Sequence, residues 1–115
     1  MSAPNFAAEH ARLRALIGEL GEAAPGPVSG FARLHGSAVT PGALDRHVKE
    51  LMALAIAICS HCQGCVGYHV HDALDAGATR EQIVETIGVA VMMGGGPALV
   101  YGAEALDALN QFQSA

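Results

Sequence analysis

The sequence predicts an all-α fold of about six helices in a single domain. Apolar residues recur at steps of three and four along most of the chain, and no segment alternates apolar and polar residues as a strand does. Aromatic residues are only 4% of the 115 residues and Trp is missing, whereas Ala, Leu, Val and Ile dominate. This composition favours closely packed helices over a sheet. A chain of this length can bury one core without disulfide staples.

Two helices are expected in the first third of the chain. The apolar and aromatic side chains that share one face of the first helix are Phe6, His10, Leu13, Ile17 and Leu20. This helix should end near Gly21, and residues 23–27 form a short break before a second helix that begins at Pro27. The second helix is expected to place Val28, Phe31 and Leu34 inward and to end at residues 40–42.

A third helix is expected from about residue 43 to Cys59, and its character changes along its length. The first half is amphipathic, whereas residues 51–59 are apolar on every side. A helix that is hydrophobic all round must be covered all round. A domain of this size hardly covers such a helix alone, so we expect contact with other copies of the chain.

Three further helices follow, each with its own start or stop signal. The fourth begins at about Cys62 and stops at Gly77. Thr79 with Gln82 is a capping-box pattern for the fifth, whose inner stripe comprises Ile83, Ile87 and Ala90. Residues 94–96 are three glycines that should form a tight turn, and Pro97 then opens the sixth helix. The apolar residues at helical spacing in that helix are Leu99, Ala103, Leu106 and Leu109.

The stretch from residue 50 to residue 69 carries the residues that point to chemistry. If the chain reverses near Ser60, Glu50 and His69 each lie about ten residues, or roughly 15 Å of helix, from the turn and can meet. Cys62, Cys65 and His69 follow at steps of three and four, so they share one helix face. A carboxylate, an imidazole and two thiols are therefore expected to converge.

Such a group suits thiol chemistry. A free thiol is mostly protonated at neutral pH, and a helix N-terminus, a basic neighbour and a Cys-x-x-Cys pairing all increase its thiolate fraction. His69 can accept or relay the thiol proton, while Glu50 can orient the imidazole, as in a nucleophile, base and orienter chain. A second cysteine resolves what the first one forms by closing a local disulfide.

With these residues in place, the chain resembles the carboxymuconolactone decarboxylase / alkylhydroperoxidase D-like superfamily of small all-helical proteins. Glu50, Cys62, Cys65 and His69 match the superfamily pattern step by step, and the likeness extends through the triple-glycine turn to cover roughly residues 28–112. One departure is that peroxidase members can carry a histidine directly before the second cysteine, where this chain has Gly64. His61, on the other side of Cys62, is a candidate accessory residue.

The resemblance implies a thiol-dependent oxidoreductase, an antioxidant peroxidase or a disulfide reductase. It implies that Cys65 is oxidised to a sulfenic acid, that Cys62 is the proton donor and disulfide partner, and that Glu50 and His69 relay protons. It also implies a homo-oligomer, commonly trimeric or hexameric, that needs no bound cofactor and is reduced by an external dithiol or a partner redox protein.

Other interpretations remain open. Lactone decarboxylation is the other activity in the superfamily, although members with that chemistry generally lack Cys-x-x-Cys. A non-catalytic oligomeric or metal-binding module is the alternative from another class. An iron–sulfur or zinc site on Cys59, Cys62 and Cys65 is disfavoured because three cysteines in one short stretch leave the ligand set incomplete. Cys59 is expected in the core, with an accessory redox role as its alternative.

Several side chains are assigned no chemistry. His10, His35 and His47 stand alone in the sequence, and His71 lies on a different helix face from His69. These assignments are made because an isolated histidine is more often a packing residue than a ligand or a base. Tyr68 and Tyr101 are expected in core or interface packing.

Charge and hydropathy narrow the partners and the compartment. The net charge is −5, the sequence pI is near 5.5, and the six Lys and Arg residues form no cluster, so neither nucleic acid nor an anionic membrane is an expected partner. No basic segment precedes an apolar block at the start of the sequence, and residues 51–59 fall far short of the ~20 apolar residues that cross a bilayer. We therefore expect a cytoplasmic protein, in which three cysteines indicate catalysis or metal binding rather than a disulfide scaffold.

Overall fold

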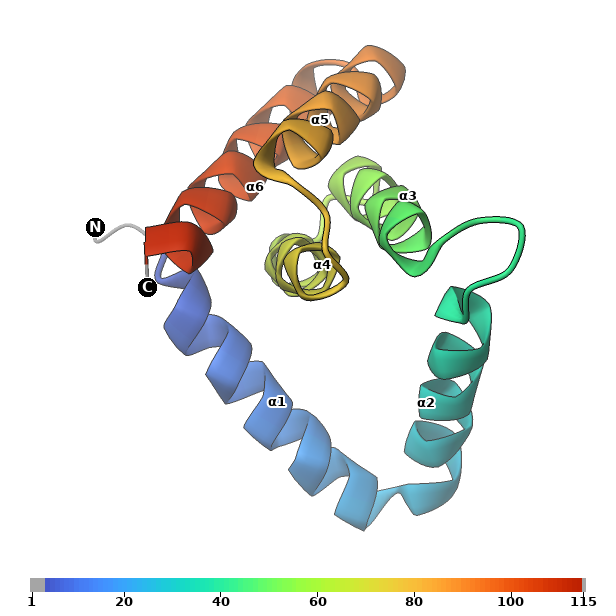
Figure 1. The fold of residues 1–115 in the computed structure, drawn as a ribbon. Helices are drawn as coiled ribbons and strands as arrows, with labels where there is room; N and C mark the ends of the chain where they lie inside the picture. Colours follow the sequence, from blue (N-terminus) through green and yellow to red (C-terminus); the bar gives the residue numbers. More distant parts are fainter. Residues whose placement is uncertain (1–3, 115) are drawn as a thin grey trace.

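The fold is all-α, as predicted. The computed structural model describes residues 4–114, and these residues contain six helices and no strand (Figure 1). The helices are α1 (Phe6–Ala23), α2 (Pro25–Val39), α3 (Arg46–Cys59), α4 (Gln63–Asp75), α5 (Arg80–Gly94) and α6 (Gly96–Ser114).

Helices α3 to α6 pack together, and α1 and α2 extend away from them. In Figure 1, α4 lies between α3 and α6, while α1 and α2 form a V whose far end returns toward α3. We call α3 and α4 the hairpin, and α1 and α2 the arm. The start of the arm is tied to the end of α6, because the Phe6 N–H donates to Gln111 Oε1 (2.6 Å) and Gln111 Nε2 donates to the Pro4 carbonyl (2.8 Å).

The core lies among the hairpin, α5 and α6. The largest apolar side chains that are fully buried are Leu54, Ile58, Val66, Val70, Ile83 and Leu109. Burial of one such side chain stabilises the fold by about 1.5–3 kcal/mol relative to leaving it exposed. Four of these six side chains belong to the hairpin, so the core fixes the relative position of α3 and α4.

The local signals for α5 and α6 act as the sequence predicts. The Thr79 side chain accepts from the Gln82 N–H, and the Gln82 side chain accepts from the Thr79 N–H, which is a complete capping box. Helix α5 ends at Gly94, and Gly95 turns the chain with a φ of 71°, a conformation that favours glycine. Helix α6 then begins at Gly96, with Pro97 in its first turn.

The predicted boundaries of the first three helices are wrong by a few residues. Helix α1 continues to Ala23 instead of ending near Gly21, and α2 begins at Pro25, so the expected break shrinks to Ala24. Pro25 suits this position because a proline in the first helical turn loses no intrahelical hydrogen bond. Helix α3 begins at Arg46 rather than near residue 43, with Asp45 as its N-cap residue.

The inward placement of α2 side chains is also wrong. No residue of α2 is buried, and Phe31 and Leu34 are 69% and 64% exposed. Residues 51–59 of α3 are likewise covered only in part, since Ile56 is 65% exposed. These segments are apolar, as predicted, but nothing else in the described residues 4–114 covers their outer faces.

Helix α6 packs mainly through small side chains, and of its predicted stripe only Leu109 is buried. Its buried residues are Ala98, Gly102, Ala105, Ala108 and Leu109. A Cβ on Gly102 would lie 2.9 Å from Ile87 Cγ2, so α5 and α6 approach too closely for a larger residue there. Leu99, by contrast, is 60% exposed.

Among residues 4–114, no helix combines the length and the apolar character needed to cross a membrane.

Candidate functional site: the cysteine pair and the buried glutamate

The hairpin turn lies where the sequence places it, directly after Ser60. The His61 N–H donates to the Ile58 carbonyl (3.3 Å), and the Cys62 N–H donates to the Ala57 carbonyl (3.5 Å). This pair of bonds is the Schellman motif that ends many helices. Its left-handed position is occupied by His61, with a φ of 57°, where glycine is usual. A non-glycine residue in this conformation costs about 1 kcal/mol or more.

The turn directs the His61 ring toward α6. The ring stacks on Tyr101, with centroids 5.2 Å apart and an interplanar angle of 12°. Tyr101 therefore packs against an imidazole that belongs to the residue before Cys62. This contact fixes the His61 ring next to the first cysteine. The histidine of the resembled peroxidases would instead precede the second cysteine, at the position of Gly64.

The two cysteines sit at the N-terminus of α4. Cys62 is the N-cap residue, and its Sγ accepts from the Cys65 N–H at 3.2 Å. Cys62 and Cys65 form a disulfide, with Cα atoms 5.2 Å apart. Cys65 is exposed and Cys62 is half-buried. The positive end of the α4 dipole lies at these sulfurs, which favours a thiolate when the bond is reduced.

Glu50 and His69 meet across the hairpin, as the spacing predicts. His69 Nδ1 lies 3.7 Å from Glu50 Oε2, and the Glu50 side chain is fully buried. This separation is an ion-pair distance and too long for a hydrogen bond. Neither the Glu50 oxygens nor His69 Nδ1 has a hydrogen-bond partner within residues 4–114. A buried carboxylate that accepts no hydrogen bond is costly, so the fold keeps Glu50 at an energetic expense.

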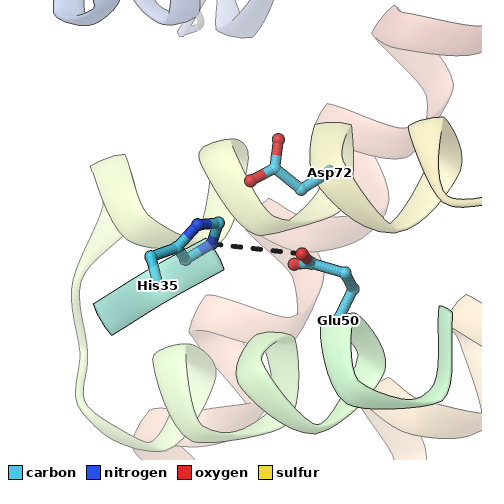
Figure 2. Close-up of side chains that lie close together, drawn as sticks. All are labelled: His35, Glu50 and Asp72. Carbon is cyan, nitrogen blue, oxygen red and sulfur yellow. Dashed lines mark ion pairs between the residues drawn. The ribbon is translucent and has the colours of Figure 1, made fainter. Parts of the chain in front are cut away.

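The structure adds two residues that the sequence interpretation missed around Glu50. His35, on α2, directs Nε2 toward Glu50 Oε1 at 4.0 Å, although it was assigned no chemistry (Figure 2). Asp72, on α4, brings a carboxylate oxygen within 4.8 Å of both. Asp72 follows His69 by three residues and could have been found from helical spacing. His35 could not, because its contact depends on how α2 crosses α3.

A second cluster joins α1 to α4 on another face. The His10 ring stacks on His71, with centroids 4.0 Å apart, and also lies beside Tyr68 and Phe112. Burial, and next the electrostatic effect of the neighbouring His71, lower the pKa of His10 below its usual value of 6.5. His10 is therefore a neutral packing residue near pH 7 and not an isolated one.

Cys59 is not the core residue that was expected. It is exposed, and its Sγ donates to the Ala90 carbonyl at 3.5 Å. It is the free cysteine of the described residues, since Cys62 and Cys65 are paired. Cys59 is the last residue of α3, and its side chain is exposed, as is that of Ile56 on the same helix.

A cavity of about 510 Å³ opens between α1 and the start of α4. Its lining includes Leu13, Gln63, Gly64, Gly67 and Tyr68. The cavity thus reaches the two residues between the cysteines. At Gly64, where peroxidases of the resembled superfamily can carry histidine, an added Cβ would touch Leu13 Cδ1 at 3.4 Å. Tyr68 lines this cavity as well as packing against His10.

Comparison with known proteins agrees with the fold and identifies the family. The model of the carboxymuconolactone decarboxylase family matches residues 25–108. An uncharacterised protein of Cupriavidus necator is 43% identical over 97 residues, which cover 82% of this chain and 86% of that protein. Uncharacterised protein 4 of the cox locus of Paracoccus denitrificans is 37% identical over 101 residues, covering 88% and 91% of the two chains.

Two solved structures share the architecture. A carboxymuconolactone decarboxylase family protein from Legionella pneumophila superposes with a TM-score of 0.90 at 39% identity, covering 96% of this chain and 98% of that one. A family protein from Thermotoga maritima, considered a candidate for a role in antioxidative response, has a TM-score of 0.83 at 25% identity and covers 92% and 91%.

Proposed function

The chain belongs to the carboxymuconolactone decarboxylase family, and we propose that within this family it is a thiol-dependent oxidoreductase of the alkylhydroperoxidase D-like kind. The observation that carries the proposal is the Cys62–Cys65 disulfide at the N-terminus of α4, one helical turn from a histidine that faces a buried glutamate. The proposed activity cycles this pair between dithiol and disulfide.

The cycle has three balanced steps. The Cys65 thiolate attacks one oxygen of a peroxide, the O–O bond breaks, and the departing alkoxide takes a proton, which leaves Cys65 as a sulfenic acid. The Cys62 sulfur then attacks the sulfenic sulfur, forming the disulfide and releasing water. An external dithiol reduces the disulfide by thiol–disulfide exchange and becomes oxidised itself. The cycle needs no bound cofactor.

The burial of each residue supports its role. Cys65 is exposed and so accessible to a substrate, whereas Cys62 is half-buried and already bonded to it. His69 lies one turn after Cys65 and holds or passes the thiol proton, and Glu50 orients the imidazole from 3.7 Å. His61 is an accessory residue in this scheme, since its ring is stacked on Tyr101.

The substrate is a peroxide or a disulfide, and the reductant is a dithiol or a partner redox protein. The candidate antioxidative role of the Thermotoga maritima relative favours the peroxide. We place the protein in the cytoplasm, where dithiol reductants keep exposed cysteines reduced.

The deciding experiment uses the reduced chain and one equivalent of peroxide. Mass spectrometry of the digested product should find a peptide that contains the Cys62–Cys65 bond, and peroxide should be consumed. Cys65→Ser should abolish consumption, because it removes the sulfur that attacks the peroxide in the proposed cycle. Full peroxide consumption by that variant would refute the assignment.

Two controls separate the rival activities. Cys59→Ser removes the free cysteine and should leave consumption unchanged. Turnover of a γ-carboxymuconolactone that survives in the Cys62→Ser, Cys65→Ser double variant would instead assign the chain to the decarboxylase activity. Reduction of a small disulfide without peroxide consumption would identify the pair as a disulfide reductase.

We also propose that the working form is a homo-oligomer, a trimer or a hexamer. Large apolar side chains that are at least 60% exposed occur on four helices and comprise Phe31, Leu34, Ile56, Met92, Met93, Leu99 and Val100. Soluble monomers rarely expose large contiguous apolar patches, and contact between copies of the chain would bury these side chains. Helix α2 buries no residue, and a helix of 15 residues is marginal without tertiary packing.

Light scattering after size exclusion tests the assembly. Phe31→Glu should shift the particle mass toward that of one chain, because it places a charge in an apolar contact. Ser29→Glu adds the same charge two residues away, on a different face of α2, and should leave the mass unchanged. A wild-type chain that elutes as a monomer would contradict the proposal.

A further inference from the structure

We propose that His35, Glu50 and Asp72 form a binding site for a divalent transition-metal ion such as Zn²⁺. One ligand atom from each residue lies within 4.8 Å of the others. The three side chains come from α2, α3 and α4, so the fold brings them together from separate elements (Figure 2). The proposed site shares Glu50 with the proposed proton relay, but it contains no cysteine, and its binding of an ion does not require the thiol chemistry.

A second observation, independent of the spacing of the ligand atoms, is that the Glu50 carboxylate is buried and accepts no hydrogen bond from the described residues. Its side chain is 0% exposed, and neither carboxylate oxygen has a hydrogen-bond partner within residues 4–114. Figure 2 shows this carboxylate directed toward the His35 ring, with Asp72 on the neighbouring helix. A buried carboxylate beside a second carboxylate is unfavourable through both lost solvation and like-charge repulsion. A cation among the three side chains removes both costs.

The donor set determines the class of ion. One imidazole nitrogen and two carboxylate oxygens suit Zn²⁺ and its first-row neighbours, whereas Mg²⁺ and Ca²⁺ prefer oxygen ligands alone. Bonds of 2.0–2.1 Å imply ligand atoms about 3.3 Å apart in a tetrahedral site. His35 Nε2 and Glu50 Oε1 are now 4.0 Å apart and all three ligand atoms lie within 4.8 Å of one another, so the side chains must approach by up to about 1.5 Å to close the site.

The surroundings allow this approach and leave a coordination position open. The His35 side chain is 40% exposed and belongs to a helix that buries no residue, so it can move toward Glu50 at little cost in packing. Glu50 Oε2 faces His69 on the other side and is left free by a metal on Oε1. Asp72 Oδ1 already contacts His71 Nδ1 at 3.2 Å, an outer contact of the kind that orients metal-binding carboxylates. Three protein ligands leave the fourth position to water.

Calorimetric titration with ZnCl₂ near neutral pH tests the site. The protein used is the full chain with the Cys62–Cys65 disulfide formed and Cys59 replaced by Ser, so that no thiolate competes for zinc. We expect saturable binding of one ion per chain. His35→Ala and Asp72→Asn should each weaken it by about tenfold or more.

Matched variants control for charge and for surface histidines. Asp75→Asn removes the same charge from the same helix, and His47→Ala removes a histidine three residues before Glu50; each should change the affinity by less than about twofold. Circular dichroism checks that every variant folds. Absence of saturable binding, or equal binding by His35→Ala, Asp72→Asn and the controls, would overturn the proposal.

A second experiment leaves His35, Glu50 and Asp72 unchanged, so its result does not depend on whether the variants fold. Crystals soaked in Zn²⁺ should give an anomalous scattering peak among the three side chains, and a peak only at other residues would refute the site. Mg²⁺ at the same concentration should not displace Zn²⁺. Equal displacement would show that the imidazole is not a ligand and would also refute it.

Discussion

The hairpin and the arm bury their apolar side chains to very different extents. In the hairpin, Leu54, Ile58, Val66 and Val70 are fully buried, whereas in the arm only Phe6 is buried. Yet the arm supplies His35 to Glu50 and His10 to the α4 cluster. The hairpin is therefore held by contacts within the chain, while the arm brings two histidines to the hairpin with little packing of its own. A metal bound to His35, or a neighbouring subunit, would hold the arm against the hairpin more firmly than its own few buried side chains do.

The largest expected difference between the two regions is in catalysis. Glu50→Gln keeps the shape of the hairpin residue but removes the charge that faces His69, so kcat for the proposed reaction should fall by about 10²–10⁴-fold. Glu22→Gln makes the same change on the arm and should be nearly silent. Stability should stay equal or rise in Glu50→Gln, because a buried carboxylate that accepts no hydrogen bond within residues 4–114 disappears. Equal activity of the two variants would remove Glu50 from the mechanism.

The next difference is in stability. Leu54→Ala in the hairpin leaves a cavity and should cost about 2–5 kcal/mol. Leu34→Ala in the arm removes a side chain that is 64% exposed and should cost less than about 0.5 kcal/mol in a dilute, monomeric sample. Urea unfolding measures both. A cost for Leu34→Ala that grows with protein concentration would show that another copy covers the arm, and a large cost at every concentration would contradict the comparison.

Where the arm packs against the hairpin, we expect a smaller effect on stability, and two glycine-to-alanine substitutions should change it in opposite directions. A Cβ on Gly67 of α4 would lie 2.8 Å from Phe6 Cδ1, so Gly67→Ala should destabilise the protein by about 1–3 kcal/mol. Gly18→Ala in α1 meets nothing within 4 Å and should stabilise by about 0.5–1 kcal/mol, because glycine is a poor helix former. Thermal unfolding of the two variants tests this opposition. Stabilisation by both would mean that Phe6 does not pack closely on Gly67.

The sequence predicts the hairpin well because its determinants are local. The positions of Glu50, Cys62, Cys65 and His69 relative to the turn follow from helical spacing alone, and the Thr79 cap follows from a four-residue pattern. The meeting of Glu50 with His69 needs only two neighbouring helices and one tight turn.

The remaining features depend on how distant helices cross. The contact of His35 with Glu50 joins helices separated by a loop, and no spacing rule reaches across it. Phe31 and Leu34 are apolar, but apolarity does not say whether this chain or another covers them. In α6, small residues such as Gly102 form most of the packing face, so the positions of large apolar residues do not identify that face, and Leu99 lies on the exposed side.

The smallest expected difference concerns pH at the contact between α1 and α4. The unfolded chain binds a proton at His10 near pH 6.5, whereas in the folded protein burial and then His71 lower the pKa of His10. As pH falls below about 6.5, the unfolded state therefore binds more protons at this residue, and the free energy of unfolding decreases. His10→Phe keeps an aromatic ring against Tyr68 and Phe112 but cannot titrate. Its urea midpoint should fall less between pH 7.5 and 5.5 than that of the wild type, by a margin below the Gly67→Ala effect. The same pH dependence in both proteins would mean that the docking of the arm does not depend on a neutral His10.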